Sequence, residues 1–228
     1  MKNIIIATPH SRNDLLLTSL KDYLTEYNIL RITSKEELNF ESLNIIKPEW
    51  IFFPHWSWKI PNEIFDNFQC VIFHMTDLPY GRGGSPLQNL IVRKKKNTVL
   101  TAIRCIKELD AGPIYKKYPL SLIGTAEEIF QRASILMVPM IVEIIQNQIE
   151  PTPQKGDVVL FDRRKSEDSN ISEISDLGCL YDHIRMLDAD GYPSAYLELN
   201  SLIFEFKRPS FNGEEIKSTV KIRKSNDS

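Results

Sequence analysis

Apolar and polar positions along the first third of the chain predict strands and helices in turn. Continuous apolar runs at residues 3–8, 28–33, 49–54 and 70–75 predict buried strands of the kind found in parallel sheets. Apolar residues at helical spacing between Leu15 and Tyr27, and a polar stretch from Ser34 to about Ile46, predict helices between the first three runs. Such alternation indicates an α/β domain with a mostly parallel sheet.

The next third begins with a helix start at Ser85-Pro86, because serine is a good helix cap and proline suits the first helical position. Residues 98–106 and 113–122 predict two more strands. Thr125 and Glu128 form a capping-box pattern that predicts a long helix to about residue 148, kinked at Pro139. The apolar part of that helix carries charged residues, which favours a packed helix over a membrane span.

The last third predicts less regular structure. A Pro-rich connection begins after residue 150, and residues 161–176 are polar, which predicts a mobile or surface segment. Residues 177–187 predict a helix, and residues from 193 onward a hairpin that turns at Asn200-Ser201. Residues 224–228 should be frayed. The expected division is therefore 1–150, 151–176 and 177–228.

The composition of the chain favours a globular protein over a membrane-bound or nucleic-acid-binding one. The chain has 228 residues, 42% hydrophobic and 25% charged, which is ordinary for a globular protein. A net charge of −2 gives no support to nucleic-acid or membrane binding through bulk charge. Three scattered cysteines without metal-ligand spacing favour a reducing compartment. The apolar run near the start is too short for a signal peptide, so a cytoplasmic protein is expected.

Three histidines follow predicted strands. His10 comes after the first run, His55 after the third and His74 at the end of the fourth. Ligands of open α/β sheets bind outside the carboxyl ends of the strands, so the three rings are expected along one edge. The alternative for each is an ordinary surface or loop histidine.

The turn after His74 contains Pro79, Gly81, Gly83 and Gly84. Such a loop either wraps a flat ligand with main-chain donors or simply connects a strand to a helix. It matches neither the dinucleotide fingerprint nor the phosphate-binding loop, so both interpretations are rejected.

Asp110 lies between two predicted strands, within the sequence Leu-Asp-Ala-Gly. It is either a turn residue or a carboxylate aimed at the same edge as the histidines. In the second case it would orient a histidine and favour the protonated ring, a pair suited to proton handling in acyl transfer.

Three motifs in order resemble the folate-dependent formyltransferases. The stretch FHMTDLPYGRGGSPLQNLI resembles the family's histidine-loop signature, LDAG places Asp110 36 residues after His74, and IRMLDADGYPSAY (184–196) resembles a C-terminal element. The matching positions in the first motif are His74, Leu78, Pro79, Arg82, Gly83, Pro86 and Gln88. The resemblance implies a Rossmann-like, mostly parallel α/β catalytic domain over 1–150 and a small C-terminal α+β extension.

One position departs from the family pattern. The family carries a catalytic Asn-x-His…Asp set, whose asparagine helps to hold the oxyanion, but Ile72 stands two residues before His74. His55 is the candidate replacement donor; main-chain N–H groups and Thr76 are alternatives. An oxyanion donor contributes roughly 10²–10³ in rate, so this change also admits a catalytically impaired module that only binds folate or nucleotide.

The resemblance implies N10-formyltetrahydrofolate as co-substrate, with no metal. His74 would take a proton or stabilise charge, and Asp110 would orient it. The folate slot is expected to involve Leu78, Pro79, Gly81, Arg82, Gly83, Leu109 and Trp58. Arg82 has a structural alternative, in which it pins the loop.

The short, slightly acidic chain looks most like the sugar N-formyltransferase branch, which acts on nucleotide-linked sugars for surface glycans. The expected acceptor is UDP-4-amino-4,6-dideoxy-N-acetyl-β-L-altrosamine, a small molecule, with no nucleic acid or membrane as partner and a homodimer as the expected assembly. Its contacts are assigned to His10, Arg12, Arg185 and Tyr192. Methionyl-tRNA, a purine precursor or a carrier-bound amino acid are the alternative acceptors.

Overall fold

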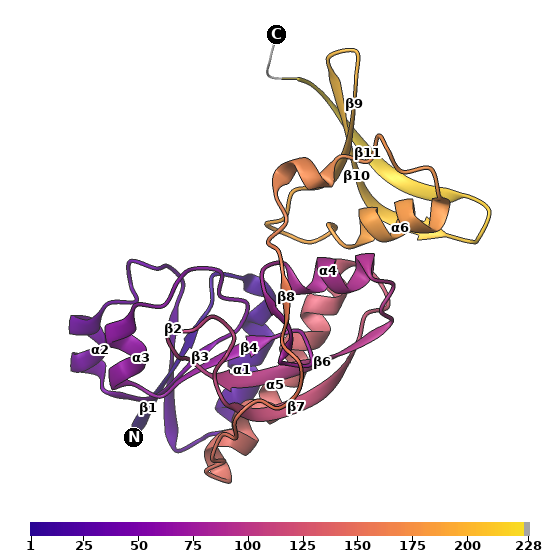
Figure 1. Cartoon of the computed structure of the whole chain (residues 1–228). Coiled ribbons are helices and arrows are strands. Elements are labelled where there is room, and N and C mark those ends of the chain that lie inside the picture. Colours follow the sequence, from indigo (N-terminus) through magenta and orange to yellow (C-terminus); the bar gives the residue numbers. More distant parts are fainter. Residues whose placement is uncertain (226–228) are drawn as a thin grey trace. The chain divides into compact units, whose positions relative to one another are not determined.

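The computed structural model describes residues 1–225, which form two compact units that interleave along the sequence (Figure 1). The first unit comprises Met1–Gly83, Val99–Leu120 and Gln131–Leu160, and the second comprises the intervening segments and the chain from Phe161 onward. The expected consecutive division at 150 and 176 does not coincide with these units. The reason is tertiary: the helix that begins at Pro86 packs on the helix that begins at Leu177, so both belong to the second unit.

The first unit is built on a six-stranded sheet with the order β2-β1-β3-β4-β6-β7. Its strands β1 to β4 are parallel, and β6 runs antiparallel to β4. The bounds are β1 Lys2–Ala7, β2 Tyr27–Ile32, β3 Pro48–Phe53, β4 Cys70–His74, β6 Asn97–Arg104 and β7 Ile114–Ser121. These six strands and the mostly parallel α/β class were predicted from the sequence. The antiparallel direction of β6 was not.

One face of the sheet carries a continuous apolar cluster. Alternate residues of β1, β3 and β4 point to this face because side chains alternate along a strand. They pack with residues of helices α2 (Phe40–Ile46) and α3 (Asn62–Asn67). The buried members include Ile5, Ile51, Cys70, Leu43 and Ile64.

The other helices differ in how well the sequence predicted them. Helix α1 (Asp14–Tyr23) follows a short 3-10 turn at Ser11–Asn13, and α5 spans Ala126–Gln146. The capping box of α5 is confirmed, since Glu128 N donates to Thr125 Oγ1 and Thr125 N donates to Glu128 Oε2. Helix α2 begins at Phe40, later than predicted, because Asn39 supplies the cap: its side chain accepts from Ser42 N at 2.9 Å.

The loop after β4 contains a strand that the sequence did not reveal. Residues Tyr80–Gly83 form β5, which pairs with β8 (Val159–Phe161) in a two-stranded sheet. The sequence of β5 has no apolar run, because two of its four residues are glycine. The short apolar run at 158–161, which contains β8, stands in a polar stretch and was not predicted to be a strand. The Leu78–Pro79 peptide that leads into β5 is cis.

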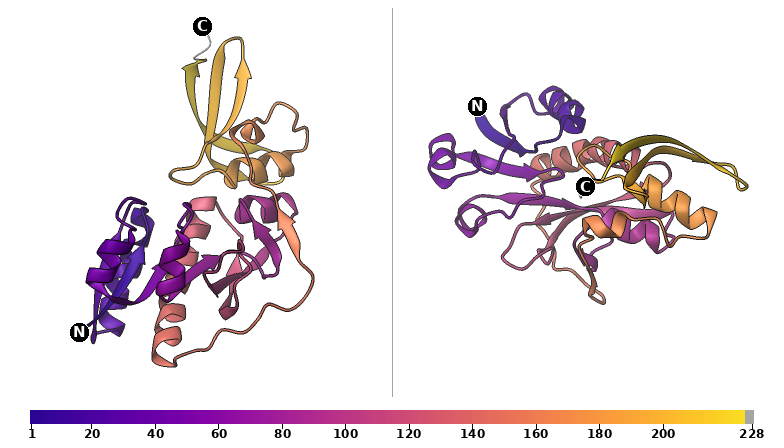
Figure 2. Two further views of the ribbon diagram at one scale, coloured as in Figure 1. Left: turned by 60° about the vertical axis from the view of Figure 1, so that its left-hand side comes forward. Right: turned by 90° about the horizontal axis from the view of Figure 1, so that it is seen from above.

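The second unit combines α4 (Pro86–Val92), a 3-10 turn (Ser166–Ser169), α6 (Leu177–Arg185) and a three-stranded antiparallel sheet (Figure 2). The sheet order is β11-β10-β9, with β9 Ala195–Leu199, β10 Leu202–Phe211 and β11 Ile216–Lys224. The turn at Asn200-Ser201 is confirmed, with both residues in the left-handed region. Strand β11 was not predicted. Lys224 belongs to it, and Ser225 N donates to Ser201 O, so these two residues are not frayed; the rest of the expected frayed end lies outside the described residues.

One further local prediction is corrected, and the surface position of the 161–176 segment agrees with the structure. Ser85 precedes α4 as predicted, but its hydroxyl does not cap the helix; it accepts from Arg164 N at 3.1 Å. The 161–176 segment lies largely at the surface but is anchored, because Ser169 and Ile171 are buried. Between residues 1 and 225, the helices are all too short or too polar to cross a membrane.

Candidate functional site

His74 and Asp110 meet at the carboxyl end of β4. The Nδ1 atom of His74 lies 3.5 Å from Asp110 Oδ1, and both side chains are buried. The other carboxylate oxygen, Oδ2, accepts a hydrogen bond of 2.9 Å from Gly83 N. Asp110 adopts a left-handed backbone with φ of 51°, which turns its side chain out of the loop between β6 and β7. Side chains far apart in sequence thus form one buried pair.

The second nitrogen of His74 is also engaged. Nε2 lies 2.7 Å from Gly81 O, a carbonyl that Thr76 Oγ1 approaches at 3.3 Å. A carbonyl and a carboxylate only accept hydrogen bonds, so the doubly protonated ring is the form that satisfies both contacts. Nε2 must leave Gly81 O before it can serve a substrate.

Gln154 ties the two loops of this site together and was missed from the sequence. Its Nε2 donates to Asp110 O and Gly112 O, both at 2.8 Å. Its Oε1 accepts from Arg82 Nε at 3.1 Å and Nη2 at 2.7 Å. These contacts favour the structural alternative for Arg82, because they fix β5 against the Asp110 loop. No local pattern marks Gln154, which lies 44 residues from Asp110.

His10, Arg12 and His55 gather at the carboxyl ends of β1 and β3. The rings of His10 and His55 lie 6.5 Å apart in an edge-on arrangement. Because β1, β3 and β4 are neighbouring parallel strands, His74 lies on the same edge of the sheet, as the sequence predicted. The contacts of His74 described above are with Asp110 and the β5 loop.

His55 is neutral near pH 7. Burial, with smaller contributions from the charges of Arg12 and His10, lowers the pKa of this histidine to about 3. Its Nδ1 lies 3.5 Å from the side-chain nitrogen of Asn13, which can only donate, so the ring proton is assigned to Nε2. Asn13 is itself oriented by Thr8, to whose Oγ1 it donates at 2.7 Å. His55 therefore carries one neutral N–H donor.

Ile72 occupies the position of the family's asparagine for a packing reason. Cys70, Ile72 and His74 point to the same face of β4, since side chains two positions apart share a face. Ile72 packs partly buried against the apolar cluster under α2 and α3. Nearby, Trp56 packs on the same cluster; its Nε1–H is buried without a hydrogen-bond acceptor among residues 1–225.

The residues expected to form the folate slot fall into two groups. Leu78 and Pro79, in the turn between β4 and β5, and Gly81, within β5, are buried. By contrast, Leu109 is 73% exposed and Trp58 is 37% exposed, with the Trp58 ring 4.8 Å from that of Trp56 in a T-shaped arrangement. The 78–84 and 109–114 segments contact each other through Gly83, Asp110 and Gln154.

Arg185 and Tyr192 belong to the second unit. Arg185 is buried, pairs with Asp182 at 2.7 Å and donates to Leu122 O and Gly124 O at 2.7 and 2.8 Å. These contacts favour a structural role that holds the 122–124 loop, in place of the expected contact with a sugar nucleotide. Tyr192 is 37% exposed and stacks on Phe130 with ring centroids 5.4 Å apart.

Two cysteines lie in the core beneath the site. Burial raises the pKa of Cys70 far above its usual value, and burial together with nearby carboxylates raises the pKa of Cys105 to about 12. Both thiols are therefore protonated and inert. Residues 1–225 hold no group of three or more histidine, cysteine or acidic side chains placed to bind a metal ion.

Comparisons with known proteins show the family of this chain. The model of the methionyl-tRNA formyltransferase C-terminal domain matches residues 166–223. A solved structure named methionyl-tRNA formyltransferase, from Clostridium thermocellum, is 48% identical with a TM-score of 0.95, and the match covers 99% of this chain and 100% of that one. The chain therefore belongs to the formyltransferase family that includes methionyl-tRNA formyltransferase.

More distant matches add context. The methionyl-tRNA formyltransferase of Bacillus thuringiensis (strain Al Hakam) is 29% identical over 179 residues, which are 75% of this chain and 56% of that protein. The chain thus spans about half the length of the curated relatives it matches.

Two further structures share the fold alone, because their identity is low. HypX from Aquifex aeolicus, in complex with tetrahydrofolic acid, is 18% identical with a TM-score of 0.75, covering 90% of this chain and 37% of that one. A sugar N-formyltransferase from a Shewanella species is 16% identical with a TM-score of 0.65, and the match covers 88% of this chain and 94% of that one.

Proposed function

We propose that this chain transfers a formyl group from N10-formyltetrahydrofolate to a primary amine. The observation that carries the proposal is the buried His74–Asp110 pair at the carboxyl edge of the sheet, with Asp110 held in turn by Gly83 N–H. Family membership supplies the class of reaction. The co-substrate supplies the formyl group; the chain supplies orientation and charge.

In this proposal His74 acts in its protonated form. Its Nε2–H donates to the formyl oxygen instead of Gly81 O, because negative charge develops on that oxygen as the amine nitrogen bonds to the formyl carbon. The bond between the formyl carbon and N10 then breaks, and the proton lost by the amine passes to N10, so that tetrahydrofolate leaves. Asp110 holds the opposite nitrogen and keeps the ring charged during the step. Release of Nε2 requires a shift of the β5 loop, which the bound donor would cause by filling the space beside it.

The donor that replaces the family's asparagine is proposed to be His55. It lies at the end of the strand next to β4 and carries a neutral N–H, so it can donate without adding a charge. Thr76 is a weaker candidate, because its hydroxyl approaches Gly81 O at 3.3 Å and the residue is fully buried.

Methionyl-tRNA is the acceptor that the names of the relatives support, including the 48% identical structure from Clostridium thermocellum. This differs from the sugar acceptor expected from the sequence, and it would make nucleic acid a partner. The altrosamine-linked sugar has no support in the comparisons.

A nucleotide-linked amino sugar is retained as the second candidate because of charge. The net charge is −2, and two of the cations on β11, Lys217 and Arg223, are paired with Glu215 and Glu205. Tight tRNA binding draws on many unpaired cations, since each phosphate contact contributes through counterion release.

The test uses N10-formyltetrahydrofolate labelled in the formyl carbon, offered with methionyl-tRNA and with a panel of UDP- and dTDP-linked amino sugars. Label in one acceptor identifies it. His74→Asn and Asp110→Asn are expected to lower kcat roughly 10²–10⁴-fold. Asp77→Asn, an exposed carboxylate paired with Lys117, is the matched control and should retain activity. Transfer that survives in the His74 variant would overturn the mechanism, and label in no acceptor would overturn the function.

A further inference from the structure

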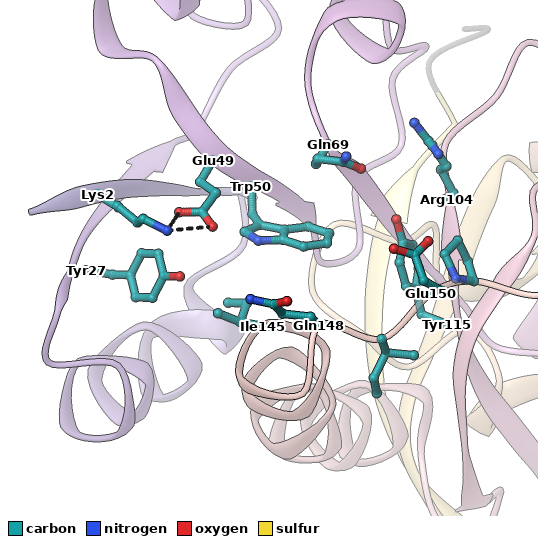
Figure 3. A pocket seen from close by; sticks show the side chains of 12 residues that line it. Lys2, Tyr27, Glu49, Trp50, Gln69, Arg104, Tyr115, Ile145, Gln148 and Glu150 are labelled. Atoms are coloured by element: carbon teal, nitrogen blue, oxygen red, sulfur yellow. Dashed lines mark hydrogen bonds and ion pairs between the residues drawn. The ribbon is translucent and has the colours of Figure 1, made fainter.

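A second concave site lies at the opposite edge of the sheet, within the first unit. It is a cavity of about 300 Å³ at the amino ends of β1, β2 and β3, closed by the end of α5 and the segment that follows it (Figure 3). Its lining includes Lys2, Tyr27, Trp50, Arg104 and Glu150. The three strand-end histidines follow the carboxyl ends of the parallel strands, so this cavity is separate from the candidate active site.

The two charged side chains at one end of the cavity form an ion pair with each other. Lys2 Nζ lies 2.9 and 3.1 Å from the two carboxylate oxygens of Glu49, so the two charges neutralise each other. This pair lies beside the start of β1 and β3, next to the Tyr27 ring (Figure 3). It leaves no charge at that end for a ligand to balance.

At the other end of the cavity, two charged side chains have no ion-pair partner within residues 1–225. The side chains of Arg104 and Glu150 are exposed, and neither makes a hydrogen bond or ion pair within residues 1–225. They flank the buried Tyr115, whose pKa is raised by burial, lowered by Arg104 and raised by Glu150. A free guanidinium and a free carboxylate on one pocket wall match a ligand that carries both charges.

An aromatic surface lies between the two ends. Trp50 packs on Phe52 with ring centroids 5.8 Å apart and meets Tyr115 edge-on at 6.0 Å, so its indole is held in place. Figure 3 shows this indole between the Lys2–Glu49 pair and the Arg104–Glu150 end. Ile145 adds an apolar wall. A fixed indole beside an apolar wall suits the ring of a flat side chain.

We propose that this pocket binds a free α-amino acid with an aromatic side chain. Arg104 pairs with the ligand carboxylate, Glu150 with its ammonium group, and Trp50 packs against its ring. The lining charges sum to zero, with Lys2 and Arg104 against Glu49 and Glu150, which suits a zwitterion better than an anion or a cation. The volume matches a ligand of amino-acid size.

The experiment titrates the whole chain with L-phenylalanine, 3-phenylpropionate and phenethylamine by calorimetry and by quenching of Trp fluorescence. Hydrogen bonds to charged groups contribute about 1.5–3 kcal/mol, so each single-charge analogue should bind at least about 10-fold more weakly than L-phenylalanine. Arg104→Gln and Glu150→Gln should weaken L-phenylalanine by a similar factor. Both positions are exposed, so the variants should fold, which circular dichroism checks.

Two control variants test whether binding depends on this pocket. Lys107→Gln removes an exposed cation that does not line the cavity, and His74→Asn alters the other edge of the sheet; both should leave the affinity unchanged. Equal binding of all three ligands, an unchanged affinity in Arg104→Gln, or no binding at about 10 mM would each overturn the proposal. None of these outcomes bears on formyl transfer, which the labelled-donor assay tests separately.

Discussion

Gln154 offers the sharpest test of how the candidate site is held. It makes two hydrogen bonds to the carbonyls of Asp110 and Gly112 and accepts two from Arg82. Neutral hydrogen bonds contribute about 0.5–1.5 kcal/mol each and those to charged groups about 1.5–3 kcal/mol. Because these groups are part-buried and water can replace some contacts, Gln154→Ala should lower the local opening free energy by about 2–4 kcal/mol.

Amide hydrogen exchange measures this effect without a substrate. Gly83 N–H donates to Asp110 Oδ2, so its exchange rate reports the position of the carboxylate. A loss of about 2 kcal/mol corresponds to exchange roughly 30-fold faster at Gly83 in Gln154→Ala. Gln146→Ala, an exposed glutamine at the end of α5, is the matched control and should leave this amide unchanged.

Formyl transfer should respond in kcat more than in KM. A displacement of about 1 Å in a positioning group can cost about 10²-fold, so Gln154→Ala should lose about that factor. Gln154→Glu keeps the acceptor for Arg82 but loses both donors, and should be impaired as well. Full kcat in Gln154→Ala together with faster exchange at Gly83 would refute the idea that Gln154 positions Asp110 for catalysis.

Three further outcomes are expected. The pKa of His55 is about 3 in the folded state and near 6.5 in the unfolded state, so between these pH values only the unfolded state binds the proton. The free energy of unfolding should therefore fall by about 1.4 kcal/mol per pH unit as the pH drops below 6.5. Urea unfolding of His55→Gln should lack this pH dependence, and the same pH slope in the variant and the unaltered protein would contradict the prediction. Only Cys179 should react with a thiol reagent in the native protein, whereas all three cysteines should react after denaturation. Rapid reaction of two or more thiols in the native protein would contradict the burial of Cys70 and Cys105. Gly112→Ala should lower Tm strongly, because its Cβ would overlap the carbonyl oxygen of Arg104, and an unchanged Tm would show that the loop relaxes freely.

Local sequence features predicted most of the first unit. The strands β1, β3 and β4 are continuous apolar runs because both faces of a mostly parallel sheet are covered, and that pattern is visible without tertiary knowledge. The capping box of α5 and the turn at Asn200-Ser201 depend on residues within three positions of each other. The motif around His74 pointed to the family for the same reason.

Tertiary structure decided the rest of the fold. An apolar run predicts a buried strand but not the direction of that strand in the sheet. The antiparallel pairing of β6 with β4 therefore depends on the path of the chain between the two strands. Strand β5 has no apolar pattern, and the short apolar run at 158–161 does not show that β8 pairs with β5; the long intervening chain folds back and brings the two strands together. The interleaving of the two units likewise follows from packing of α4 on α6.

The sequence by itself determined the six strands of the main sheet, the long helix α5, the carboxyl edge on which the histidines lie, and the pairing of His74 with Asp110 as a hypothesis. Only the tertiary structure showed which groups Arg82 and Arg185 contact, that Gln154 joins the two loops, and that Ile72 belongs to the apolar cluster under α2 and α3. The physical reason is the distance along the sequence over which each effect acts. Propensity, capping and periodicity depend on residues a few positions apart, whereas the partners of a buried polar group can be far away in the sequence and are brought close only by folding.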